Sequence, residues 1–324
     1  MRIVMMGTGT FAEPTFEALL GGRHPVLGLV TQPDREIGEA RSSTRQTGRG
    51  MKALAAERGI TVLQPDKINT PEGVAGLRAL EPDLLAVAAY GQILSDEVLS
   101  IPRLGGINVH ASLLPKYRGA APVAWAIYHG ETETGVTIIR MTTGLDAGDM
   151  LAQEKLVIGP EETAGELEAR LAPLGAKMAV QIVEQLAAGT ATGAKQDRAL
   201  VAKAPKLTKE NGLIDWTRPA AAVCNQVRAM QPWPTAYTWW HREGKPQLRL
   251  MIARCLARAD EATADVKPGS CLARPGDRML GIASGQGVVE ILELQPAGKR
   301  RMEIGEFLRG NAVGAGDWFG AENE

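Results

Sequence analysis

The chain has 324 residues, of which 44% are hydrophobic and 23% charged, with a formal net charge of -1 at pH 7. This balance is typical of a folded globular protein with room for about two domains. The neutral total excludes a protein that binds nucleic acid through a general basic field. Apolar runs stay well short of the roughly 20 residues that cross a bilayer, so we expect no membrane partner.

The first 190 residues alternate short apolar runs with helical patterns. Helical spacing occurs in residues 11–20, 50–59 and 163–189, the last with a possible break at Pro173. The apolar runs that predict strands are residues 2–7, 26–34, 60–65, 83–91, 105–115 and 135–151. Such alternation predicts an α/β domain with a mostly parallel, doubly wound sheet. In such a sheet, ligands bind outside the carboxyl ends of the strands.

The composition of the sequence changes after residue 190. Residues 191–209 are polar, basic and broken by Gly and Pro, which predicts a linker. Residues 210–324 contain short apolar runs between turn residues, which predicts an antiparallel β-barrel resembling an OB-fold. Four aromatic residues of this part are expected in its core, although stacking on bases is an alternative: Trp233, Tyr237, Trp239 and Trp240.

Two stretches concentrate positive charge on this otherwise neutral chain. Residues 35–52 carry a net charge of +3, and residues 195–209 carry +4. Such patches suit contact with a polyanion at one face. Solvated surface loops would have the same composition, so both interpretations stay open.

Asn108, His110 and Asp146 form a candidate catalytic group. Asn108 and His110 are two residues apart on a predicted strand, so both point to one face, and Asp146 ends another predicted strand. An amide can donate to a developing oxyanion, an imidazole can move a proton near neutral pH, and a carboxylate can orient the imidazole. Because no Ser or Cys stands in a nucleophile elbow, direct acyl transfer fits better than a covalent intermediate. Taken singly, the Asn and Asp would fit turns and the His a hydrogen-bonded core position.

Two other kinds of site are disfavoured. Gly7 and Gly9 begin a dinucleotide-binding pattern, but Ala12 stands where the third glycine belongs, and Asp34 is the acid that could bind a ribose. A tight turn explains the glycines better. The remaining histidines and the three cysteines lack metal-ligand spacing, so we expect no metal, no disulfide framework and a reducing, cytoplasmic location.

The motifs together resemble those of the methionyl-tRNA formyltransferases. INVHASLLPKYRGAAP (107–122) and GETETGVTIIRMTTGLDAGDML (130–151) carry the likeness most strongly. It begins at GTGTFAEPTFEALL and continues through KLTKENGLIDW, RAMQPWPTA and LELQPAGKRRM, covering nearly the whole chain. The SLLP-x-x-RG core is typical of enzymes that use 10-formyltetrahydrofolate, whereas the second domain indicates the tRNA enzyme.

The resemblance implies transfer of a formyl group from 10-formyltetrahydrofolate, as co-substrate, to the amino group of methionyl initiator tRNA. It implies Asn108, His110 and Asp146 as catalytic residues, and a monomeric protein with an OB-like tRNA-binding domain. The folate-binding positions that it implies are Ser112, Leu113, Leu114, Pro115, Gln92, Ile93, Leu94, Thr142, Thr143, Gly144 and Leu145. The tRNA-binding positions that it implies are Arg41, Arg45, Arg49, Lys206 and Lys209.

One loop departs from the family pattern, and three other functions stay open. The basic loop after Asp34 is longer than usual, and its Gly48-Arg49-Gly50 comes late, so Arg41, Arg45 and Arg49 are all candidates for the acceptor stem. The alternatives are a formyltransferase acting on an amino-sugar nucleotide, a 10-formyltetrahydrofolate hydrolase, and an RNA-binding protein that has lost activity. Folate-dependent turnover and its acceptor distinguish them.

Overall fold

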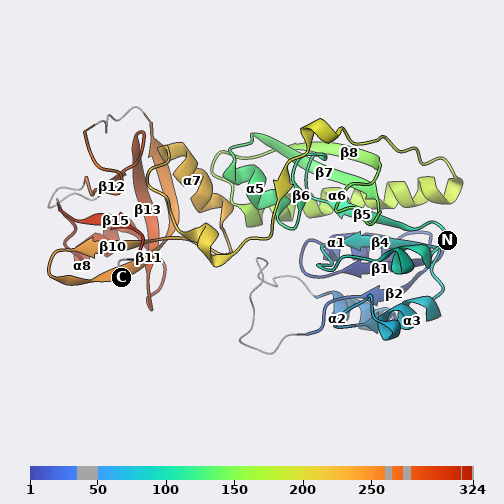
Figure 1. The fold of residues 1–324 in the computed structure, drawn as a ribbon. Coiled ribbons are helices and arrows are strands. Elements are labelled where there is room, and N and C mark those ends of the chain that lie inside the picture. The colour runs from blue at the N-terminus through green and yellow to red at the C-terminus, as the bar shows by residue number, and fades with distance from the viewer. Residues whose placement is uncertain (35–49, 260–264, 273–278, 315, 323–324) are drawn as a thin grey trace. The chain divides into compact units, whose positions relative to one another are not determined.

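The computed structural model describes residues 1–34, 50–259, 265–272, 279–314 and 316–322 (Figure 1). The chain forms two compact units. The first comprises Met1–Val123, Thr132–Gly159 and Gly165–Lys206, and the second comprises Ala124–Glu131, Pro160–Ala164 and Leu207–Glu324. The expected domain boundaries at residues 190 and 210 stay a prediction.

The first unit is built on a seven-stranded sheet with the order β3-β2-β1-β4-β5-β7-β8. The five strands β1 to β5 are parallel, as the alternating pattern predicts. The strands are β1 (Ile3–Gly7), β2 (Val26–Val30), β3 (Thr61–Leu63), β4 (Leu84–Ala88), β5 (Gly106–His110), β7 (Glu133–Arg140) and β8 (Met150–Val157). The helices of this part of the chain are α1 (Glu13–Leu20), α2 (Met51–Glu57), α3 (Pro71–Ala79), α4 (Asp96–Ser100) and α6 (Ala164–Ala188).

Local sequence explains the central strands and two of the helix starts. All five residues of β4 are buried, as expected for a strand covered on both faces. Helix α3 follows Thr70, whose side chain accepts from the Gly73 amide, and α4 follows Ser95, which accepts from the Val98 amide. These caps satisfy amides that a helix start leaves without partners.

Helix α6 runs without a break through Pro173, where the sequence allowed an interruption. Its buried side chains recur at helical spacing and include Leu167, Leu171 and Ala179. Packing of this apolar face outweighs the single backbone hydrogen bond that a proline removes. Gly175 lets the helix approach the sheet closely, because a Cβ there would come 2.6 Å from Cγ1 of Val109.

At one edge of the sheet, β7 runs antiparallel to its neighbours, and this places the loop that follows it beside β5. Strand β7 is antiparallel to β5, with Arg140 opposite Ile107 and Thr137 opposite His110. The loop after β7 therefore begins beside the start of β5, where the Met141 amide donates to the Gly106 carbonyl at 2.8 Å. The expectation of one strand over residues 135–151 that Asp146 ends is wrong, because β7 ends at Arg140 and β8 begins at Met150. Asp146 lies in the loop between them, which reaches Asn108 of β5.

The second unit is a six-stranded antiparallel sheet with the path β12-β13-β11-β10-β15, to which β14 adds through β13. The strands are β10 (Ala236–Arg242), β11 (Lys245–Arg258), β12 (Leu280–Ala283), β13 (Val288–Pro296), β14 (Met302–Glu303) and β15 (Trp318–Gly320). Helices α7 (Ala220–Ala229) and α8 (Ile304–Gly310) belong to this unit, and α5 (Pro122–Tyr128) enters it at Ala124. The predicted antiparallel β-domain is confirmed.

Residues 269–271, which in the sequence are only part of a short apolar run, connect β12 and β15, the two end strands of this sheet. Ser270 bridges Trp318 of β15, and Cys271 bridges Ile282 of β12. The Phe319 amide also donates to the Gly269 carbonyl at 2.7 Å, while the Gly269 amide donates to Ala283 at 2.8 Å. The sheet therefore curls toward a barrel, which satisfies backbone groups that two open edges would expose.

Trp240 fills the interior of this β-domain as expected, whereas Trp233, Tyr237 and Trp239, which were expected there too, are only partly buried. The Trp240 side chain is fully buried, stacks on Phe319 and meets Phe307 edge-on. Tyr237 faces outward by comparison and lies under the guanidinium group of Arg249. Burial of such large rings supplies much of the stabilisation of a small sheet.

Within the described residues, no helix has the length and apolarity that a membrane crossing requires.

Glu168 on α6 makes the stability of the fold dependent on pH. Burial raises the pKa of its carboxyl group to about 7, from an ordinary value of 4.5. Between these values the folded state binds more protons than the unfolded state, so stability falls as pH rises from 4.5 to 7. We expect Glu168→Gln to raise Tm at pH 8 by more than about 2 °C, with a smaller gain at pH 5.

The matched control is Glu17→Gln, which removes an exposed carboxylate from α1. Thermal unfolding of both variants and the parent chain at pH 5 and pH 8 checks the expectation. An equal effect of Glu168→Gln at the two pH values would contradict it.

Candidate active site

Strand β5 presents Asn108 and His110 on one face of the first unit's sheet. Val109, between them, lies against Gly175 of α6 on the opposite face. Because side chains alternate along a strand, the amide and the imidazole point away from α6. Asn108 and His110 therefore share one face of the sheet, as their spacing predicts.

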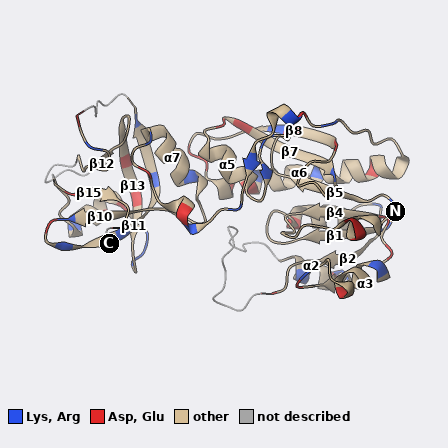
Figure 2. Cartoon of the chain, in the orientation of Figure 1, with Lys and Arg blue, Asp and Glu red and all other residues tan. Residues whose placement is uncertain are grey.

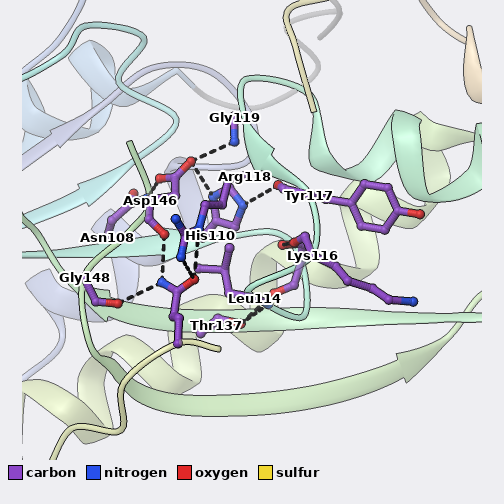
Figure 3. A network of polar contacts seen from close by, with 12 residues as sticks. Asn108, His110, Leu114, Lys116, Tyr117, Arg118, Gly119, Thr137, Asp146 and Gly148 are labelled. Atoms are coloured by element: carbon purple, nitrogen blue, oxygen red, sulfur yellow. Dashed lines mark hydrogen bonds and ion pairs between the residues drawn. The ribbon is translucent and has the colours of Figure 1, made fainter. Parts of the chain in front are cut away.

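Asp146 reaches the same place from the loop between β7 and β8 (Figure 3). Its Oδ1 accepts from Nδ2 of Asn108 at 3.3 Å, and its Oδ2 accepts from the Gly119 amide at 2.9 Å. Oδ2 also lies 3.6 Å from Nδ1 of His110. The Asp146 side chain is 12% exposed and that of His110 is 5% exposed. The three predicted residues thus meet in a largely buried polar cluster.

The orientation of the His110 ring is fixed by a backbone carbonyl. Its Nε2 lies 2.9 Å from the carbonyl oxygen of Tyr117. Since a carbonyl only accepts, Nε2 carries a proton and donates it to this bond. Nδ1 faces Asp146 at a distance longer than an ordinary hydrogen bond. This nitrogen is consequently the one available to a reacting group.

Residues 112–115, which the resemblance implies in folate binding, are held by Thr137 of β7. Thr137 Oγ1 donates to the Ser112 carbonyl at 2.6 Å and accepts from the Leu114 amide at 3.1 Å. Ser112 itself is buried and donates its hydroxyl to the Lys116 carbonyl at 2.7 Å. Leu114 is buried, whereas Leu113 and Pro115 are partly exposed. The segment is thus a rigid frame whose backbone groups are mostly paired.

The other positions implied in folate binding divide into structural and exposed side chains. Gln92 accepts from the Ile68 amide at 2.8 Å and ties its loop to the neighbouring one. Leu94 belongs to the hydrophobic cluster under β1 and β4, which Met141 also touches. Ile93 is 71% exposed and Leu145 is 60% exposed, which is unusual for large apolar residues.

Leu145 lies in an exposed loop that contains the last of these positions. Thr142, Thr143 and Gly144 are also exposed there, and the Thr142 hydroxyl donates to the Gly144 carbonyl at 3.4 Å.

Only two of the five residues implied in tRNA binding lie in the described part of the chain. Arg41, Arg45 and Arg49 lie outside the described residues. Lys206 and Lys209 are exposed, one at the end of the first unit and one in the turn Lys209–Gly212 of the second. Elsewhere in the described part of the chain, Lys and Arg are interspersed with Asp and Glu (Figure 2).

The acid considered for ribose binding is engaged by neighbouring side chains. Asp34 pairs with Lys52 and accepts from Gln64 at 3.2 Å. The hydrogen bond from Lys52 holds the pKa of Asp34 below its ordinary value. Across the described ranges, His, Cys, Asp and Glu form no group of three that could hold a metal.

Several groups that complete the site carried no recognisable sequence signal. The Tyr117 carbonyl and the Gly119 amide act through the backbone, so side-chain patterns say nothing of them. Gln196, in the predicted linker, donates to the Asp146 carbonyl at 2.8 Å. Tyr117, Arg118 and Gly119 all lie in the SLLP-x-x-RG segment that the sequence singled out, but that motif assigned none of them a role in the site.

Comparison with known proteins identifies the family. The profile of the Formyl transferase family matches residues 1–183, and that of the Formyl transferase C-terminal domain matches residues 206–312. A methionyl-tRNA formyltransferase of Citrifermentans bemidjiense is 43% identical over 323 residues, covering 100% of this chain and 98% of the relative. The chain belongs to the methionyl-tRNA formyltransferases.

Another member of this family, from Geobacter sulfurreducens, is 45% identical over 99% of this chain and 97% of its own length. Two solved structures share the fold at low identity. The sugar 3N-formyl transferase WlaRD is 16% identical with a TM-score of 0.66, covering 93% of this chain and 99% of its own. HypX from Aquifex aeolicus is 17% identical with a TM-score of 0.57, covering 100% of this chain and 51% of its own.

Thr137 provides a test of the frame around residues 112–115. Thr137→Val keeps the shape of the side chain but leaves the Ser112 carbonyl and the Leu114 amide without this partner. A buried polar group without a partner costs about 1–3 kcal/mol, so we expect the free energy of unfolding to fall by that amount.

Urea denaturation of the full chain measures this loss, and Thr137→Ser is the control because it keeps the hydroxyl. A Val variant as stable as the parent chain would show that these bonds contribute nothing.

Proposed function

We propose that Asn108, His110 and Asp146 carry out formyl transfer from 10-formyltetrahydrofolate to the amino group of methionyl initiator tRNA. The observation that carries this proposal is the convergence of the three side chains, with Asp146 within 3.3 Å of Asn108 and 3.6 Å of His110. Relatives more than 40% identical over nearly their full length are named methionyl-tRNA formyltransferases. The structures of WlaRD and HypX were obtained with 5-N-formyl-THF and tetrahydrofolic acid, respectively, which supports a folate donor.

In this mechanism the amine of methionyl-tRNA attacks the formyl carbon on N10 of the folate. A tetrahedral intermediate forms, with negative charge on the former carbonyl oxygen. The amine gives up a proton to Asp146 through a water molecule. The bond from carbon to N10 then breaks, N10 takes up a proton, and formyl-methionyl-tRNA and tetrahydrofolate are released.

Asn108 and a protonated His110 stabilise the oxyanion in this proposal. With Nε2 of His110 committed to the Tyr117 carbonyl, Nδ1–H is the donor that remains. Asp146 supports the positive charge of the ring from 3.6 Å and fixes the amide of Asn108. The cluster is mostly buried, so these interactions act in a low dielectric and need little reorganisation during the reaction.

The pterin would bind between the loops that carry Ile93 and Leu145. Both side chains are large, apolar and exposed, which suits contact with a flat ring. Met141, at the start of the second loop, packs on the same hydrophobic cluster as Leu94 of the first. Residues 112–115 would border the formyl end, because His110 lies only two residues before Ser112.

The acceptor would be held by basic residues outside the catalytic cluster. Arg41, Arg45 and Arg49 are the candidates for the acceptor stem, and exposed Lys206 and Lys209 suit contact with the phosphate backbone. A sugar formyltransferase would have no use for the basic loop. The long likeness to tRNA enzymes, including residues 206–312, favours the tRNA acceptor over an amino-sugar nucleotide.

Purified protein with labelled initiator and elongator methionyl-tRNA, with and without 10-formyltetrahydrofolate, tests the acceptor and donor together. Folate-dependent formylation of the initiator tRNA is the expected result. Formate released without an acceptor would indicate a hydrolase, and formylation of an amino-sugar nucleotide alone would indicate the sugar enzyme. An absence of folate-dependent turnover would leave RNA binding as the function.

We also propose that the chain acts as a monomer in the cytoplasm. Cys224, Cys255 and Cys271 are free thiols, which suits a reducing compartment. Light scattering of the purified chain measures its mass, and a mass near 69 kDa rather than 34.5 kDa would contradict the monomer.

Loss of Asn108 should affect turnover more than binding. Removal of one oxyanion donor typically lowers kcat by about 100- to 1000-fold, or roughly 3–4 kcal/mol. We expect Asn108→Ala to fall in this range, with KM for tRNA nearly unchanged because the amide acts mainly in the transition state. Steady-state kinetics measures both constants, and an unchanged kcat would remove Asn108 from the mechanism.

Neutralising the loop should instead weaken tRNA binding. We expect Arg41→Ala, Arg45→Ala and Arg49→Ala, made singly, to identify the arginine whose loss raises KM for tRNA most. The dependence of log affinity on log salt should flatten by about one unit or less for each phosphate contact removed. Arg23→Ala, an exposed arginine elsewhere, is the control. An unchanged salt dependence in all three variants would mean that the loop makes no phosphate contact.

A further inference from the structure

Gln196 uses its whole hydrogen-bonding capacity at the edge of the active site. Its Nε2 donates to the carbonyls of Asp146 and Gly148, each at 2.8 Å. Its Oε1 accepts from Nε and NH2 of Arg118 at 3.0 and 2.7 Å. Two donated and two accepted bonds fix the amide in one orientation, because a flipped amide would oppose like groups on both sides.

The Asp146 backbone is held in a conformation that needs such support. Asp146 has φ of +46°, in the left-handed region that few residues other than glycine occupy. Two residues on, Gly148 passes so close to β7 that a Cβ there would come 1.6 Å from the Arg140 carbonyl. Gln196 binds the carbonyls at both ends of this turn. These two bonds hold the backbone of the turn and thereby the direction in which the Asp146 side chain points.

The same amide joins this turn to the segment on the other side of the cluster. Arg118 and Gly119 form strand β6 (Arg118–Gly119), which pairs with β9 (Lys203–Ala204) a few residues after Gln196. Gly119 donates its amide to Asp146, and Tyr117, the residue just before β6, offers its carbonyl to His110. Gln196 therefore contacts both segments that hold Asp146 against the imidazole.

We infer that Gln196 is a positioning residue that sets the Asp146 carboxylate against His110 and Asn108. The inference rests on the proposed catalytic role of Asp146. It makes the segment between α6 and the second unit a part of the active-site frame, although that segment has the composition of a linker. Misplacing a reacting group by about 1 Å costs up to about 100-fold in rate, which is the scale expected when such a support is removed.

Gln196→Glu is the sharpest variant. A carboxylate can still accept from Arg118, but it has no N–H for the two carbonyls and sets negative charge against them. We expect kcat to fall about 10- to 100-fold, with KM for both substrates within about threefold of the parent value. Gln181→Glu makes the same charge change at an exposed position of α6 and should leave kcat unchanged.

A double-mutant comparison separates positioning of Asp146 from a general structural role. If Gln196 acts through Asp146, adding Gln196→Ala to Asp146→Asn should lower kcat by less than about threefold beyond Asp146→Asn alone. If the two substitutions acted independently, their fold reductions in kcat would multiply. Thermal unfolding of each variant shows whether the protein is folded at the assay temperature. Because the Ala variant bears no new charge, it keeps the test valid should the Glu variant fail to fold.

The outcomes also distinguish this inference from the proposed mechanism. An unchanged kcat in both Gln196 variants, or effects that multiply with Asp146→Asn, would overturn the positioning role and leave the mechanism intact. A normal kcat in Asp146→Asn would overturn the mechanism and the inference together. Loss of activity that follows loss of folded protein would assign Gln196 to stability alone, which also rejects the inference.

Discussion

The buried carboxylate of Asp146 is the group around which the site is organised. A charge removed from water is unfavourable unless other groups pair with it, and here an amide side chain, a backbone amide and an imidazole surround it. The three partners come from β5 and β6, so the carboxylate can be satisfied only when the loop after β7 folds back over the sheet. Its own conformation, with φ in the left-handed region, is maintained by that arrangement.

Segments that the sequence separates widely meet at this carboxylate. Gln196 and Arg118, 78 positions apart, hydrogen-bond to each other, and pairing of β6 with β9 fixes the register between their segments. Gly119 is required at the crossing, because a Cβ there would come 2.4 Å from the Ala204 carbonyl. The end of the first unit therefore contributes directly to the shape of the polar cluster around Asp146.

The fold by itself does not select the acceptor. A sugar N-formyl transferase and HypX share this architecture at 16% and 17% identity, whereas the methionyl-tRNA formyltransferases resemble the chain over its full length at 43–45%. One fold can host different functions, so the shared architecture alone does not identify the acceptor. We propose that residues outside the shared frame select the acceptor, with the basic stretches at residues 35–52 and 195–209 as the candidates.

Local pattern alone determined strands β1 to β5 and helices α1, α2 and α6 of the first unit, the placing of Asn108 and His110 on one face, and the antiparallel character of the second unit. These follow from periodicities of 2 and 3.6 residues, which depend only on neighbours in sequence. Tertiary packing decided the continuity of α6 through Pro173, the antiparallel β7 and the linking of β12 to β15 through residues 270–271. It also decided that Gln196 and the backbone of residues 117–119 belong to the site. Backbone groups and contacts between positions tens of residues apart leave no periodic signal, so only the folded chain shows them.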